Sequence, residues 1–129
     1  MTKSDESFRT ASEICSNGLI SLSPDSPLEE TIQVMNFWKY SQLPVEDISG
    51  CLGLVTENSI LKFQLDHGRD SMLKAKAVDV MESPPSIINW EQPIARDILE
   101  LLYDSKSILV NQNGRVRRII TQMDVLKEN

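Results

Sequence analysis

The chain has 129 residues, 40% of them hydrophobic and 25% charged, and it carries a net charge of −6. This length fits about one domain, and an acidic chain lacks the basic surface that binding to nucleic acid or anionic membranes requires. No apolar run reaches the ~18 residues of a transmembrane helix, and the polar N-terminus is unlike a signal peptide. We therefore expect no nucleic-acid or membrane partner, and a cytoplasmic protein whose Cys15 and Cys51 are reduced thiols.

The first half reads as alternating strands and helices behind a disordered lead-in at residues 1–9. The predicted elements are, in order, a helical turn, a strand, a helix, two strands and a helix: 11–15, 19–22, 27–40, 42–45, 51–55 and 56–66. Ser26 is predicted as the N-cap of the first long helix, with Pro27 at its first position and Glu29 completing a capping box. A polar connector should begin at residue 67.

The second half repeats this order. After a segment at 77–81 that resembles 11–15, the predicted elements are a strand, a helix, two strands and a short helix: 86–89, 94–103, 107–110, 116–120 and from 121 onward. Asn113-Gly114 is a strong hairpin signal, and Thr121 is a good N-cap with Asp124 three residues later.

Three separate features recur at a nearly constant distance along the chain. Val80 follows Ile14 by 66 residues, Pro93 follows Pro27 by 66, and Thr121 follows Thr56 by 65. This is an internal duplication, and units this small need to pack together to bury a core. We expect an α+β fold of two βαββα repeats in pseudo-twofold packing, with repeats at 10–68 and 76–129 and a linker at 69–75.

The motifs resemble those of the CBS-domain pair, or Bateman module, over about residues 10–129. The second repeat carries the resemblance at 78–81, 83–85, 108–110, 113–116 and 119–126, and the first repeat at 43–45 and 53–56. The resemblance implies a protein that is not an enzyme. It also implies an adenosine-containing ligand (AMP, ADP, ATP, or S-adenosylmethionine) in a cleft between the repeats, a homodimer, and a separate effector protein.

The ligand motif of this family is Gly, two apolar residues, Thr or Ser, two further residues, then Asp. The family Asp holds the ribose hydroxyls, and the Thr lies near the ribose and phosphate. The second repeat matches at Thr121 and Asp124 but has Arg118 in place of the Gly. The resemblance therefore implies a competent site around Asp124, although the same two residues also fit a plain helix cap.

The first repeat matches the motif at Gly53 and Thr56, but Ser59 stands where the family has Asp. This departure implies a degenerate first site.

Three further features bear on a ligand or metal site. Arg118 is positioned either to bind a phosphate, to block the site, or to act as exposed charge on a strand edge. By resemblance, the segment of Pro85, Ile87 and Ile88 flanks the adenine, although it also fits an ordinary buried strand. His67 lies in a polar linker without partner spacing, which gives no metal or catalytic site.

Each long helix carries apolar residues outside its core stripe. Val34 and Trp38 do so in the first repeat, and Leu99 and Tyr103 in the second. A soluble helix needs one apolar stripe for its core, so a second one indicates either a wide core face or burial in a homodimer, which we favour. The sequence leaves a ligand-free interaction or dimerisation scaffold as the alternative function.

Overall fold

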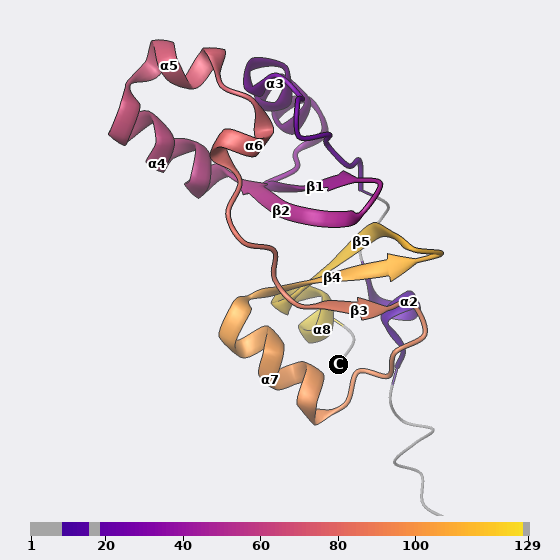
Figure 1. Cartoon of the computed structure of the whole chain (residues 1–129). Helices are drawn as coiled ribbons and strands as arrows, with labels where there is room; N and C mark the ends of the chain where they lie inside the picture. Colours follow the sequence, from indigo (N-terminus) through magenta and orange to yellow (C-terminus); the bar gives the residue numbers. More distant parts are fainter. Residues whose placement is uncertain (1–8, 16–18, 128–129) are drawn as a thin grey trace, which may run out of the picture. The chain divides into compact units, whose positions relative to one another are not determined.

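The computed structural model describes residues 9–15 and 19–127, which fall into two compact units. One unit combines the described parts of Met1–Leu19 and Pro85–Asn129, and the other is Ile20–Pro84 (Figure 1). Each unit contains a small sheet and several helices, which confirms the predicted α+β class. Residues 1–8, predicted to be disordered, lie outside the described residues.

The unit of Ile20–Pro84 is built on a two-stranded antiparallel hairpin. Its elements are α3 (Leu28–Trp38), β1 (Gln42–Asp47), β2 (Gly50–Thr56), α4 (Glu57–His67), α5 (Arg69–Lys74) and α6 (Ala77–Val80). The hairpin has a register shift between Val45 and Glu46. Figure 1 shows α4 following directly from β2, so the end of β2 fixes where α4 begins.

The strand predicted at 19–22 is wrong, because only Leu22 pairs, through a single parallel bridge to Val45. The Leu22 amide donates to the Pro44 carbonyl at 2.8 Å, and the Leu22 carbonyl accepts from the Glu46 amide at 2.8 Å. The chain then turns, with the Ser26 amide bonded to the Ser23 carbonyl at 3.0 Å. This turn ends the pairing after one residue.

The predicted cap of the first long helix is also wrong. The Ser26 hydroxyl accepts from the Ser23 amide at 3.0 Å, and Pro27 is the N-cap residue without a side-chain cap bond. The Leu28 amide instead donates to the Ala75 carbonyl at 2.9 Å. A backbone carbonyl from a distant segment therefore accepts the hydrogen bond that a local cap was expected to accept. The predicted connector contains α5 in place of irregular chain.

The other unit is built on a three-stranded sheet of order β3-β4-β5. Its elements are α2 (Ala11–Ile14), β3 (Ile87–Asn89), α7 (Arg96–Ser105), β4 (Ser107–Gln112), β5 (Arg115–Thr121) and α8 (Gln122–Lys127). β3 runs parallel to β4, and β4 antiparallel to β5. The hairpin predicted at Asn113-Gly114 is confirmed, with positive φ values of 56° and 81° as a tight primed turn requires.

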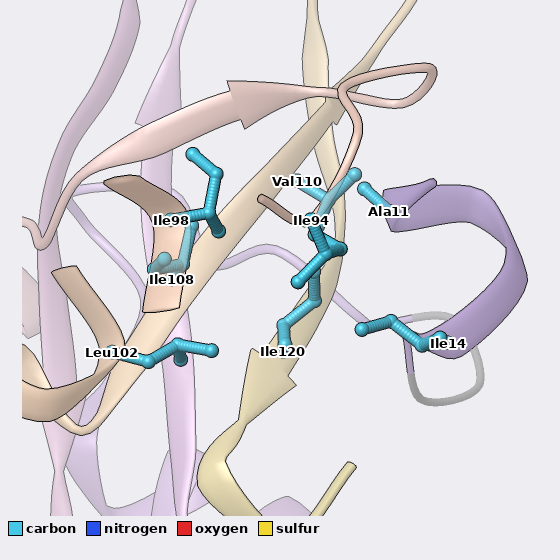
Figure 2. Close-up of a cluster of buried hydrophobic side chains, with 8 residues drawn as sticks. All are labelled: Ala11, Ile14, Ile94, Ile98, Leu102, Ile108, Val110 and Ile120. Atoms are coloured by element: carbon cyan, nitrogen blue, oxygen red, sulfur yellow. The ribbon is translucent and has the colours of Figure 1, made fainter. Parts of the chain in front are cut away.

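Figure 2 shows the core of this unit, where side chains from α2, from α7 and Ile94 before it, and from the two longer strands point at one another. The eight buried members are Ala11, Ile14, Ile94, Ile98, Leu102, Ile108, Val110 and Ile120. The helix stripe of α7 and the inward residues of β4 and β5 thus bury one another, as the periodicity of each predicts.

The two short lead-in helices each join the unit formed mainly by the other repeat. In α2, the Ala11 amide donates to the Gln92 carbonyl at 2.8 Å and the Ser12 amide to the Trp90 carbonyl at 2.8 Å. In α6, the Ala77 amide donates to the Ser26 carbonyl at 2.9 Å. These bonds place α2, from the first repeat, in the unit of the second repeat, and α6, from the second repeat, in the unit of the first.

Candidate functional site

The predicted pair of Thr121 and Asp124 comes together where β5 ends and α8 begins. The Thr121 amide and hydroxyl both donate to Asp124 Oδ2, at 2.8 and 3.1 Å, and the Asp124 amide donates to Thr121 Oγ1 at 3.4 Å. Asp124 is only 8% exposed. A hydroxyl and a carboxylate are therefore held in fixed geometry at a helix start, where backbone amides also favour anions.

The corresponding pair in the first repeat has the same local arrangement. The Thr56 amide donates to Ser59 Oγ at 2.9 Å, and the Ser59 amide donates to Thr56 Oγ1 at 2.9 Å. The Ser59 hydroxyl donates in turn to the Thr56 carbonyl at 3.0 Å. Ser59 and Asp124 therefore hold the same place in their capping boxes, three residues after Thr56 and Thr121, and only Asp124 adds a carboxylate.

Arg118 is held against an aromatic ring that sequence reasoning missed. Its guanidinium carbon lies 5.1 Å from the centroid of the Trp90 ring, a cation–π distance. Arg118 pairs with Val110 on β4, which pairs with Ile88 on β3. The strand register therefore puts Ile88 and Arg118 in one row across the sheet. Trp90 lies just beyond β3, and nothing in its local sequence indicated a contact with Arg118.

The segment entering β3 lies at the same end of the sheet as Thr121. β4 begins there with Ser107, which pairs with Thr121. Ile87 is the first residue of β3 and its side chain is partly exposed, and Pro85 comes two residues before it. The unit thus brings the predicted base-flanking segment and the Thr121 pair to one end of the sheet, on either side of β4.

Cys15 follows α2 and lies near the two charged site residues of this unit. Burial raises the pKa of the Cys15 thiol above its usual range, and the positive charge of Arg118 partly opposes that rise in pKa. The thiol is therefore protonated near neutral pH, as expected of a packed cysteine.

A pocket of about 910 Å³ lies in the unit of Ile20–Pro84, between α3, α4 and α5. Ile32, Met35, Ile60 and Met72 are among its apolar lining residues, and none of the predicted ligand residues lines it. Within residues 9–15 and 19–127, no group of three or more His, Cys, Asp or Glu side chains is placed to hold a metal ion. None of the described helices has the length and apolar character to cross a membrane.

Residues 11–66 match the family model of the CBS domain. Comparison with curated proteins gave no match. Among solved structures, a CBS domain-containing protein of unknown function from Bacillus anthracis is 23% identical, with a TM-score of 0.82 over 97% of this chain and 96% of that one.

Two other solved structures have the same fold at lower identity. CBSX2 in complex with AMP is 18% identical, with a TM-score of 0.72 over 93% of this chain and 95% of that one. Hypoxic Response Protein I, with two coordinated zinc ions, is 20% identical, with a TM-score of 0.77 over 94% of this chain and 99% of that one. Residues 11–66 therefore match the CBS domain, and nearly the whole chain shares the fold of solved CBS-domain structures.

Proposed function

We propose that this protein is a regulatory module that binds an adenosine-containing ligand of the AMP, ADP or ATP class and signals to a separate effector protein. The observation that carries the proposal is the Asp124 carboxylate held beside the Thr121 hydroxyl at the start of α8. The CBS-domain structure that contains AMP supports the choice of ligand class.

The chemistry of this pair suits a ribose. A carboxylate offers about four acceptor directions, and two neighbouring ribose hydroxyls can donate to it together. Hydrogen bonds to a charged group contribute about 1.5–3 kcal/mol each. Thr121 and Asp124 are proposed as the ribose anchor. Pro85, Ile87 and Ile88 are proposed to lie beside the base, and Arg118 is the cation proposed to contact a phosphate.

Isothermal titration calorimetry with AMP, ADP, ATP and S-adenosylmethionine tests this proposal. Asp124→Ser is the matched variant, because Ser59 completes the capping box at the start of α4 without a carboxylate. We expect micromolar binding of at least one ligand, about −8 kcal/mol, weakened at least tenfold in Asp124→Ser. Absence of binding, or equal binding by the variant, would overturn the proposed site.

The exposed apolar side chains of α3 and α7 support the proposal of a homodimer. Trp38 is 58% exposed and Tyr103 is 81% exposed, so neither is buried in its own unit. We expect a dimer mass by light scattering at micromolar concentration, and a monomer mass for the double variant Trp38→Glu with Tyr103→Glu. A monomer mass for the unsubstituted chain would contradict the dimer.

One observation favours the alternative, a ligand-free interaction and dimerisation scaffold. Both Asp124 and Ser59 complete a capping box at the start of a helix, a role that needs no ligand. A folded dimer that binds none of the four ligands would support the scaffold.

A further inference from the structure

One end of the three-stranded sheet carries a cavity lined mainly by side-chain amides. β3 and β4 are parallel, so their carboxyl ends lie at the same end of the sheet, as Figure 1 shows. A cavity of about 610 Å³ opens there, and its lining residues include Asn89, Trp90, Gln92, Asn111, Gln112 and Asn113. Thr121 pairs with Ser107 at the other end of β4. The cavity is therefore separate from the proposed adenosine site.

Main-chain hydrogen bonds hold the walls of this cavity in place. The Trp90 amide donates to the Asn111 carbonyl at 3.0 Å, and the Gln92 amide donates to the Asn89 carbonyl at 3.0 Å. The Trp90 and Gln92 carbonyls in turn accept from the first amides of α2, each at 2.8 Å. All of these bonds use backbone groups. They shape the cavity without using the side-chain amides that line it.

Asn111 carries an acceptor atom that no group in the described part of the chain satisfies. Its Oδ1 atom is buried and has no hydrogen-bond partner. A buried acceptor without a donor is unfavourable, and native proteins leave few of them. The register of β4 against β5 shifts between Val110 and Asn111, and bulges of this kind re-aim side chains. Because the last torsion of an asparagine is soft, the Asn111 amide can turn and present Oδ1 to a donor in the cavity.

The first repeat shows that the fold does not require this unsatisfied amide. The register shift of the β1–β2 hairpin puts Glu46 in the place of Asn111, and Asp47 then takes the place of Gln112. Oε1 of Glu46 accepts from the Ser21 hydroxyl at 2.5 Å. The first repeat thus has two acidic side chains where the second has two neutral amides, and the acceptor at its bulge has a donor.

The groups around the cavity suit a neutral ligand that is rich in hydroxyls. A side-chain amide both donates and accepts, and so does a hydroxyl. Among the described lining residues there is no Lys or Arg, and Glu91 supplies the only charge, which disfavours phosphates and other anions. Trp90 adds an aromatic surface, which packs against apolar C–H groups. A sugar ring combines hydroxyls at its edge with C–H groups on its faces, and the cavity volume lies in the range of small-ligand sites.

We propose that this cavity binds a neutral sugar, with the amides of Gln92, Asn111 and Gln112 bonded to its hydroxyls and Trp90 packed against its ring. The site differs from the proposed adenosine site in both position and ligand. The inference therefore does not rest on the proposed function, and a failure of AMP binding leaves it unaffected.

NMR titration of the full chain, labelled with ¹⁵N, tests the assignment. The probes are glucose, galactose, mannose and maltose, each added separately. We expect at least one of them to shift the side-chain amide signals of Gln92, Asn111 and Gln112, with a dissociation constant of about 1 mM or tighter. If none of the four sugars shifts these signals, the inference is overturned.

The variant Asn111→Leu separates a ligand contact from a structural role. Leucine fills a similar space and has no acceptor, so removal of the unsatisfied oxygen should leave Tm unchanged or raise it, while sugar binding weakens at least tenfold. Gln92→Ala is the second variant, because it keeps both main-chain bonds of Gln92, and it should also weaken binding. Asn58→Leu is the matched control, because Asn58 is an exposed amide on α4, outside the cavity, and its variant should bind as the unsubstituted chain does.

Two results with these variants would overturn the inference. A lower Tm in Asn111→Leu with unchanged sugar affinity would show that the Asn111 amide is purely structural. An equal loss of affinity in Asn58→Leu, or unchanged affinity in Gln92→Ala and Asn111→Leu together, would place the bound sugar elsewhere on the protein.

Discussion

Gly53→Ala is expected to destabilise the protein because an added methyl group has no room. The new Cβ would lie 2.7 Å from the Glu82 carbonyl oxygen, 2.7 Å from the Met81 sulfur and 2.8 Å from Met81 Cγ. The Met81 side chain can rotate away, but the Glu82 carbonyl is held by its bond to the Leu54 amide at 2.9 Å. Relief of the clash therefore requires the antiparallel bridge between Leu54 and Glu82 to open.

The expected loss follows from the bonds of that bridge. Opening it removes two backbone hydrogen bonds, each worth about 1 kcal/mol, which agrees with the ~1–3 kcal/mol typical of overpacking. Alanine also restricts the unfolded chain relative to glycine, which offsets about 0.4–1 kcal/mol. We expect a net decrease of about 1–2 kcal/mol in the free energy of unfolding.

Urea denaturation followed by circular dichroism measures this change, with the slope m checked for constancy. The variant Met81→Ala, alone and combined with Gly53→Ala, completes a double-mutant cycle. If the backbone contact dominates, removal of the Met81 side chain should restore less than about 0.5 kcal/mol. A loss below about 0.5 kcal/mol in Gly53→Ala at unchanged m, or full rescue by Met81→Ala, would refute the reasoning.

Three further predictions concern the unit that contains the second repeat and the two thiols. Asp124→Ala should lower the free energy of unfolding in urea by about 1–2 kcal/mol, because it removes the carboxylate that accepts from the Thr121 amide in the capping box of α8. Asp124→Ser should cost less than half as much, and equal losses would show that the capping box is unimportant. Arg118→Ala should lower the free energy of unfolding by about 0.5–1 kcal/mol, because the contact with the Trp90 ring is lost. In a Trp90→Leu background this contact is already absent, so Arg118→Ala should then cost less. An equal loss in both backgrounds would show that the contact is not the cause. Burial raises the pKa of both Cys15 and Cys51 in the folded protein. The protonated thiols therefore contribute fully to the free energy of unfolding below the ordinary thiol pKa of about 8.5, and this contribution is lost as the pH rises toward the raised pKa of the folded state. Titration of the native thiols with a disulfide reagent should therefore show a rate that rises only above that pH, and fast reaction at pH 7 would contradict it.

Local patterns in the sequence were sufficient for those parts of the site that close over three or four residues. Thr121 and Asp124, and Thr56 and Ser59, meet because a helix start brings residues three apart together. The hairpin at Asn113-Gly114 formed as predicted because few other residues adopt its positive φ values.

Contacts between distant segments decided the rest. The Ala75 carbonyl, not Ser26, satisfies the first amide of α3, and Trp90 meets Arg118 only because β3 and β5 flank β4.

The sequence by itself determined the duplication, the α+β class and both capped helix starts, because each depends on spacing within a repeat. Only the tertiary structure decided that each lead-in helix joins the unit of the other repeat, and that Glu82 therefore lies beside Thr56. The physical reason is that a backbone bridge such as Leu54–Glu82 is formed by amide and carbonyl groups that all residues share. Side-chain identity leaves almost no trace of such a pairing in the sequence, except for the glycine that makes room for it.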